Sequence, residues 1–160
     1  MLLMGPYESK SPSQSPNFVG WFLTFDGREA IVTAMTDSDL YLVDSSGWVE
    51  FIGDGPKSGA FGHYLNDFSR LLVPAIVVYE IHKKLLLTKN DRALGRFISH
   101  AFRAKQVPLD AELADSAARA SIGHQLAMAD AIVYASAQMH GAQLVTADPD
   151  FRGLPGVIIP

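Results

Sequence analysis

Leu40-Tyr41-Leu42-Val43-Asp44 is a short apolar run that ends on a carboxylate, and Leu144-Val145-Thr146-Ala147-Asp148 repeats this pattern later in the chain. An apolar run of this length and bulk is typical of a strand buried on both faces of a parallel sheet. In open α/β sheets the ligand lies beyond the carboxyl ends of the strands. Asp44 and Asp148 therefore predict where the chemistry of this chain takes place.

Further strands and helices alternate between and around these two runs. Ser45 or Ser46 is placed to cap the first helix, Pro74 suits a first helical turn, Asp110 suits a cap and Gly141 suits a helix end. The apolar runs predict strands at residues 40–43, 71–73, 107–109, 144–145 and 157–159. Helical spacing predicts helices at residues 48–52, 61–68, 76–87, 92–105, 111–120 and 127–139. This alternation, without hairpin signals from residue 35 onward, indicates an α/β fold with a mainly parallel sheet.

The composition narrows the classes of function. The chain has 160 residues, enough for one ordinary domain, and its 48% hydrophobic residues can bury a core, which excludes wholesale disorder. Thirteen Lys and Arg against 17 Asp and Glu give a net charge of −4, which argues against a protein that holds nucleic acid by bulk charge. Cysteine is absent, which excludes disulfides and zinc–thiolate sites and fits a reducing cytoplasm. No apolar run reaches the roughly 18 residues that a membrane span needs.

The first 34 residues differ from the rest. A polar stretch rich in serine and proline, residues 6–16, precedes an apolar patch at residues 18–25 that suits a strand or an adhesive segment. Met35 then precedes the first clean strand. We therefore expect an N-terminal extension or leader at residues 1–34, partly disordered, and a functional domain at residues 35–160. An over-called translation start, an artificial leader and a natural segment all fit this extension.

Two further acids interrupt apolar helical stretches. Glu80 lies within Ile76-Val77-Val78-Tyr79-Glu80-Ile81, and Asp130 lies within Met128-Ala129-Asp130-Ala131-Ile132-Val133. A carboxylate among apolar neighbours costs free energy unless it is paired, hydrogen-bonded or bound to a metal. The rule for open α/β sheets can bring all four acids to one edge, where their mutual repulsion needs a counter-charge. Oxygen-only ligands suit Mg²⁺ or Mn²⁺.

Each acid also has a purely structural interpretation. Asp44 can cap the helix after the first strand, and Asp130 can cap a helix that starts near Ala131. Glu80 can face solvent on an amphipathic helix, and Asp148 can be an ordinary turn residue. The metal-binding interpretation therefore depends on the four acids jointly.

Four motifs, in this order and spacing, resemble the PIN-domain nucleases of the VapC toxin type. They are Leu42-Val43-Asp44-Ser45-Ser46-Gly47-Trp48-Val49-Glu50-Phe51, Pro74-Ala75-Ile76-Val77-Val78-Tyr79-Glu80-Ile81, Asp130-Ala131-Ile132-Val133-Tyr134-Ala135-Ser136-Ala137 and Leu144-Val145-Thr146-Ala147-Asp148-Pro149-Asp150-Phe151. The resemblance runs from residue 40 to the C-terminus and leaves residues 1–34 outside. It implies a three-layer α/β/α PIN-like fold with a mainly parallel central sheet.

Two positions depart from the family pattern. Ser45 stands where the family more often has Thr, a change that should be harmless. Around Ala147-Asp148-Pro149 the family often carries a basic residue nearby, which leaves the substrate contacts there open.

The resemblance also implies roles for particular residues. The catalytic, metal-binding acids are Asp44, Glu80, Asp130 and Asp148. The supporting hydroxyls are those of Ser46 and Thr146, which can hydrogen-bond the carboxylates or a metal-bound water. Asp150 is a candidate auxiliary acid, although its pattern favours a cap for the segment through Phe151.

The implied activity is that of a metal-dependent endoribonuclease that hydrolyses RNA phosphodiester bonds and leaves a 5′-phosphate and a 3′-hydroxyl. Mg²⁺ or Mn²⁺ would neutralise the phosphate charge, position the phosphate and lower the pKa of a bound water. The implied role is the toxin of a type II toxin–antitoxin pair. The implied partners are RNA, a cognate VapB-like antitoxin and a second copy of the chain in a homodimer, all in the cytoplasm and without a membrane.

A basic stretch follows the second motif. Between residues 83 and 105 seven basic residues accompany a single acid, Asp91, in a chain that is otherwise acidic. Such a run can be a solvated helical face. Because the four acids lie nearby in the predicted fold, a surface that contacts RNA phosphates explains the run equally well. The candidate RNA contacts are Lys83, Lys84, Lys89, Arg92 and Arg96.

Two other functions stay open at this point. One is a PIN-domain nuclease of RNA processing that has no antitoxin. The other is a non-catalytic PIN-like binding module, against which the presence of all four acids argues. An aspartyl-nucleophile phosphatase is a weaker option, because it would want a second Asp two residues after Asp44, where Ser46 stands.

Overall fold

The computed structural model describes residues 21–25, 28–32 and 40–160. The chain forms two units, Met1–Asp37 and Ser38–Pro160. The stretch at residues 6–16, for which the sequence predicts disorder, lies outside the described residues. No helix in the described part of the chain is long and apolar enough to cross a membrane.

The first unit contains a small antiparallel sheet. Strand β1 (Trp21–Phe25) pairs with β2 (Arg28–Val32) over their full lengths, so that the two strands form a hairpin. β1 lies in the apolar patch at residues 18–25, which suits a strand from its sequence. The second strand has no counterpart in the sequence-based prediction.

The second unit is built around a five-stranded sheet in which every neighbouring pair is parallel. The strand order is β5-β4-β3-β6-β7. The strands are β3 (Tyr41–Val43), β4 (Leu71–Pro74), β5 (Lys105–Val107), β6 (Gln143–Val145) and β7 (Val157–Ile158). The chain proceeds outward from β3 to β5 and then returns to the other side of β3 for the last two strands. The boundary between β3 and β6 is therefore a topological switch point, where open α/β sheets bind ligands.

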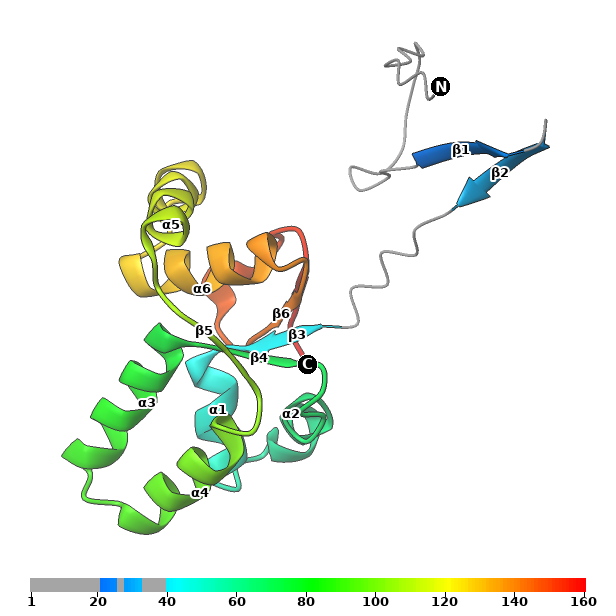
Figure 1. Ribbon diagram of the computed structural model, residues 1–160. Helices are drawn as coiled ribbons and strands as arrows, with labels where there is room; N and C mark the ends of the chain where they lie inside the picture. Colours follow the sequence, from blue (N-terminus) through cyan, green and yellow to red (C-terminus); the bar gives the residue numbers. More distant parts are fainter. Residues whose placement is uncertain (1–20, 26–27, 33–39) are drawn as a thin grey trace. The chain divides into compact units, whose positions relative to one another are not determined.

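Helices cover both faces of this sheet. Figure 1 shows α5 and α6 on one face and α1, α3 and α4 on the other, which confirms the three-layer α/β/α fold. The helices of the second unit are α1 (Ser45–Ile52), α2 (Ser58–Leu65), α3 (Ala75–Leu87), α4 (Asp91–Ala101), α5 (Ala111–His124), α6 (Met128–Met139) and the short 3₁₀ helix η1 (Pro149–Phe151).

The core fixes the start of α1 against the sheet and against α4. Trp48 and Phe97 are fully buried, and their rings meet edge to face with 5.0 Å between centroids. Gly47 permits the close approach of α1, because a Cβ at this position would lie 2.5 Å from the Phe61 ring and 2.7 Å from a methyl group of Val43. This packing determines where the chain leaves β3 and enters α1.

The sequence-based prediction is wrong at the end of α4. The helix ends at Ala101, about one turn before the predicted end at residue 105, and β5 begins two residues before its predicted start. The Gln106 side chain donates to the carbonyls of Ala101 at 2.7 Å and Ala104 at 3.2 Å, which satisfies acceptors at the helix end. Because β5 is an edge strand, Lys105 and Gln106 are exposed, and the apolar signal of a buried strand is missing.

Candidate active site

Asp44 follows β3 and is at once a helix cap and a member of the site. Its carboxylate accepts hydrogen bonds from the backbone N–H of Ser45 at 2.6 Å and of Ser46 at 3.4 Å, so that it caps α1. The prediction that Ser45 or Ser46 caps this helix is therefore wrong, and the alternative in which Asp44 caps it is confirmed. Only 4% of Asp44 is exposed, and its side chain also lines the cleft described below.

Two hydroxyls join the ends of β3 and β6. The Ser46 Oγ–H donates to Asp44 Oδ2 at 2.9 Å, and the Thr146 Oγ1–H donates to the same oxygen at 3.0 Å. In return the Ser46 hydroxyl accepts the Ala147 N–H at 3.0 Å, and the Thr146 hydroxyl accepts the Asp148 N–H at 2.9 Å. The hydroxyls predicted to support the site thus hold Asp44 and the loop after β6 in one network.

Asp148 caps η1 in the same way that Asp44 caps α1. Its Oδ1 accepts the backbone N–H of Asp150 at 2.9 Å. The prediction that Asp150 caps the segment through Phe151 is therefore wrong, because Asp150 is the capped residue and its side chain is exposed. The turn interpretation of Asp148 is correct, but it does not exclude a place in the site.

Glu80 and Asp130 come from helices rather than from strand ends. Glu80 lies in the second turn of α3 and Asp130 in the first turn of α6, and both are partly buried. Ala127 is the N-cap of α6, so the alternative in which Asp130 caps a helix starting near Ala131 is wrong. The alternative in which Glu80 faces open solvent is also wrong, because its side chain lines the cleft.

An open cleft of about 560 Å³ lies at the switch point of the sheet and brings the four predicted acids together. It is lined by Asp44, Glu80, Asp130 and Asp148, together with Ser45, Ser46, Val49, Glu50, Ile81, Lys84 and Ala147. The cleft therefore receives side chains from the ends of β3 and β6 and from α1, α3 and α6.

The cleft carries negative charge that the described residues do not balance. The pKa of Asp130 is raised to about 6, mainly by burial and also by the charges of Asp44, Asp148, Glu80 and, least of all, Asp150. The Asp130 carboxylate thus lies within electrostatic reach of every other acid of the site.

Glu80 is affected in the same direction. Burial is the main cause that raises its pKa, and the charge of Asp44 adds to this effect. A hydrogen bond with the Ser45 side chain and the charge of Lys83 oppose the shift without cancelling it.

The donor chemistry of the cleft fits a divalent cation. In the described ranges, no three acidic or histidine side chains stand close enough together to form a finished set of metal ligands. The acids do face one shared cleft, they offer only hard oxygen donors, and their mutual repulsion raises the pKa of Asp130. A hard cation such as Mg²⁺ binds through one or two carboxylates and keeps several waters, so it does not need a finished protein cage.

Two residues of the cleft were missed by the sequence analysis as members of the site. Ser45 contacts both Asp44 and Glu80, but the sequence analysis treated it only as a helix cap. Glu50 lines the cleft four residues after Ser46, and this spacing on a helix places both residues on one face. Helical spacing from the supporting hydroxyl is therefore the signal that would have found Glu50.

The candidate RNA contacts are placed differently from one another. Lys84 lines the cleft, whereas the Lys83 ammonium lies over the Tyr79 ring at 5.6 Å from its centroid. Lys89 follows α3, Arg92 lies in the first turn of α4, and both are exposed.

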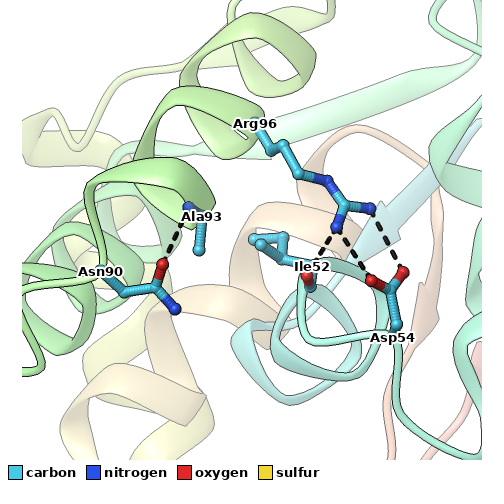
Figure 2. Close-up of polar contacts among 5 residues, drawn as sticks. All are labelled: Ile52, Asp54, Asn90, Ala93 and Arg96. Carbon is cyan, nitrogen blue, oxygen red and sulfur yellow. Dashed lines mark hydrogen bonds and ion pairs between the residues drawn. The ribbon is translucent and has the colours of Figure 1, made fainter.

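Arg96 contacts the C-terminal end of α1 and the turn that follows it. Its guanidinium donates to the Ile52 carbonyl at 3.0 Å and to the Asp54 carboxylate at 3.1 Å, as Figure 2 shows. The same figure shows Asn90 capping α4 by accepting the Ala93 N–H. The contacts of Arg96 therefore join α4 to the C-terminal end of α1.

Comparison with solved structures places this fold among several bacterial proteins. A toxin–antitoxin complex from Klebsiella pneumoniae matches with a TM-score of 0.65 and 20% identity, over 75% of this chain and 97% of that chain. VapC20 from Mycobacterium tuberculosis, a toxin that cleaves the sarcin–ricin loop, matches with a TM-score of 0.60 and 19% identity, over 75% and 99% of the two chains. FitAcB from Neisseria gonorrhoeae matches with a TM-score of 0.61 and 20% identity, over 76% and 98%.

Comparison with models of protein families assigns the chain to a family. No curated protein sequence matches the chain. The model of the PIN domain, however, matches residues 41–157, which include all four acids of the cleft. Since this match spans well over half of the sequence, the chain belongs to the PIN domain family.

Proposed function

We propose that this protein is a metal-dependent endoribonuclease that hydrolyses RNA phosphodiester bonds with Mg²⁺ or Mn²⁺, and that it is the toxin of a VapBC-type toxin–antitoxin pair. The observation that carries the proposal is the cleft at the switch point, in which a PIN-domain chain collects Asp44, Glu80, Asp130 and Asp148. A cleft lined by acids repels a phosphodiester unless a cation stands between them.

The acids of the cleft would contribute to cation binding in different ways. Asp44 Oδ2 already accepts the hydroxyls of Ser46 and Thr146, so its other oxygen, Oδ1, is better placed to bind a ligand. Glu80 and Asp130 add carboxylates whose pKa is raised, mainly by burial and also by the charges of the neighbouring acids. When bound, a divalent cation neutralises the phosphate charge and lowers the pKa of a bound water.

The antitoxin and the homodimer belong to the same proposal. Complexes of toxins with antitoxins occur among the proteins of similar fold, including the one from Klebsiella pneumoniae and a DNA-bound VapBC from Salmonella typhimurium. A small neighbouring gene whose product binds this chain would support the toxin role. A nuclease without such a partner would instead fit RNA processing.

The nuclease proposal is tested by incubating the purified protein with a mixed RNA pool in Mg²⁺, in Mn²⁺ and in a chelator, and by mapping the cut ends. We expect cleavage only with metal, with 5′-phosphate and 3′-hydroxyl ends. Asp44→Asn should reduce the rate by at least about 100-fold, since it alters the most firmly held acid of the cleft. Asp115→Asn is the matched control, because Asp115 pairs with Arg119 on the exposed face of α5.

Cleavage that persists in the chelator, or that is unchanged in Asp44→Asn, would refute the metal mechanism. RNA binding without cleavage in either metal would favour the non-catalytic binding module instead.

A further inference from the structure

Helix α3 carries two adjacent lysines in different surroundings. The Lys84 side chain lines the acidic cleft, and it is the single basic side chain that does so in the described part of the chain. Lys83 does not line the cleft: its ammonium lies over the Tyr79 ring, and its charge acts on the cleft only through a lowering of the pKa of Glu80. Both lysines are exposed, so either can be replaced without disturbing the core.

The charge of Lys84 is available to a ligand. Lys84 stands four residues after Glu80, and this spacing places both side chains on the same face of α3. Among the described residues, nevertheless, its ammonium forms no ion pair with a carboxylate. At the end of α3 it is the backbone carbonyl of Lys84, and not its side chain, that accepts the Thr88 hydroxyl.

The other basic candidates are placed less well for a ligand in the cleft. Arg96 is bound to Asp54 and to the Ile52 carbonyl (Figure 2). Lys89 and Arg92 are exposed beyond the end of α3 and do not line the cleft. The residues of the basic stretch therefore differ in whether they reach the acidic cleft.

From these placements we infer that Lys84 binds a backbone phosphate of the RNA next to the scissile bond, and that the remaining members of the basic stretch contribute little to binding in the cleft. This inference rests on the proposed nuclease function. Five acidic side chains and one lysine line the cleft, so an RNA strand that enters it meets repulsion that a lysine beside the phosphate offsets. A contact with a phosphate beside the reacting one affects RNA binding more than the rate of the bond-breaking step.

The test compares Lys84→Gln with Lys83→Gln, which removes the same charge one residue away, and with Lys84→Arg, which keeps the charge. Equilibrium binding is measured in chelator with a fluorescein-labelled single-stranded RNA of mixed sequence, by anisotropy over a series of salt concentrations. Release of counterions from one phosphate contact predicts a Kd about fivefold higher for Lys84→Gln at about 0.1 M salt, and a log–log salt slope smaller by about 0.7. Cleavage in Mg²⁺ should show the same rise in KM with kcat nearly unchanged.

Lys83→Gln and Lys84→Arg should bind within about twofold of the parent protein. Equal losses in Lys84→Gln and Lys83→Gln would overturn the inference, because they would show a diffuse charge effect. A lower kcat at unchanged Kd would also overturn it. If the parent protein binds RNA through Lys84 but cuts nothing in Mg²⁺ or Mn²⁺, the phosphate contact is supported and the nuclease function is refuted.

Discussion

The two halves of the acidic cleft are built in different ways. At the strand ends, Asp44 and Asp148 take part in a continuous set of hydrogen bonds with Ser46, Thr146 and the backbone of the loop after β6. Each of these acids also caps the helix that follows it. Their positions are therefore fixed by the same bonds that start α1 and η1.

On the helices, the acids lack such a continuous set of bonds, although Glu80 has a hydrogen bond with the Ser45 side chain. Asp130 accepts no hydrogen bond from the described residues, and both Asp130 and Glu80 have a raised pKa for which burial is the main cause. The comparison shows that hydrogen bonds fix the positions of the strand-end acids, whereas the helix acids carry charge that their surroundings do not balance. A cation bound between the two halves would be positioned by the strand-end acids and would stabilise the charge of the helix acids.

Among the variants that test this comparison, the largest effect is expected from one that removes a hydrogen-bonding group of the rigid half. Thr146→Val removes the hydroxyl that donates to Asp44 and accepts the Asp148 N–H, so that both groups lose this partner. We expect RNA cleavage to fall by about 10–100-fold, as for other residues that orient metal ligands. The measurement is the initial rate of RNA cleavage over a range of Mg²⁺ concentrations.

Thr146→Ser provides the matched control, because it keeps the hydroxyl. It should retain most of the activity and the Mg²⁺ dependence of the parent protein. Full activity in Thr146→Val, or a loss in Thr146→Ser as large as that in Thr146→Val, would contradict the role given to the hydroxyl.

A smaller effect concerns the charged half and its dependence on pH. In the folded chain the pKa of Asp130 is raised from 3.8 to about 6, so the fold favours the protonated carboxyl. Its contribution to the free energy of unfolding is therefore fully present below pH 3.8 and is lost as the pH rises to about 6. After allowance for solvent screening, we expect the loss to be about 1 kcal/mol.

The measurement is urea unfolding in chelator across this pH range for the parent protein and Asp130→Asn. The variant should lack this loss and be the more stable protein above pH about 6. Asp44→Asn should instead be less stable than the parent, because an amide keeps a single acceptor oxygen, so that either the hydroxyls of Ser46 and Thr146 or the Ser45 N–H lose their acceptor. If both variants gain stability equally, the two halves do not differ as described.

The smallest effect concerns the two units of the chain. We propose that the PIN domain begins near residue 35, and that a chain starting at Met35 folds and keeps metal-dependent nuclease activity. We expect the Tm to change by no more than about 2–4 °C, because the removed serine- and proline-rich residues cannot form a core by themselves. Scanning calorimetry and RNA cleavage test this expectation, and an aggregated product would show that the first unit is integral to the fold.

The sequence predicted that these four acids lie together, as they do along the cleft, better than it predicted their surroundings. Asp44 and Asp148 follow buried strands whose apolar runs are readable without a structure, and a parallel sheet must bring such ends to one edge. Glu80 and Asp130 stand out because apolar neighbours surround them. The contacts of Ser45 with both Asp44 and Glu80 depend on how α1 and α3 pack, which no local pattern encodes.

The errors in the fold have similar causes. The edge strand β5 exposes Lys105 and Gln106, so a search for buried apolar runs places it too late. Asp44, Ser45 and Ser46 all have side chains that can cap α1, and only the structure shows that Asp44 is the N-cap. Arg96 resembled its basic neighbours in sequence, and only the packing of α4 against the end of α1 distinguishes it.

The hydrogen bonds between Asp44 and Thr146 join residues 102 positions apart, and this separation has a consequence for synthesis of the protein. A ribosome that has released only the segment through α6 has already exposed three of the four acids, but the strand that carries Thr146 and Asp148 is still missing. The sheet cannot place β6 beside β3 before that strand emerges. The cleft of the PIN domain is in this way incomplete until β6 has been synthesised.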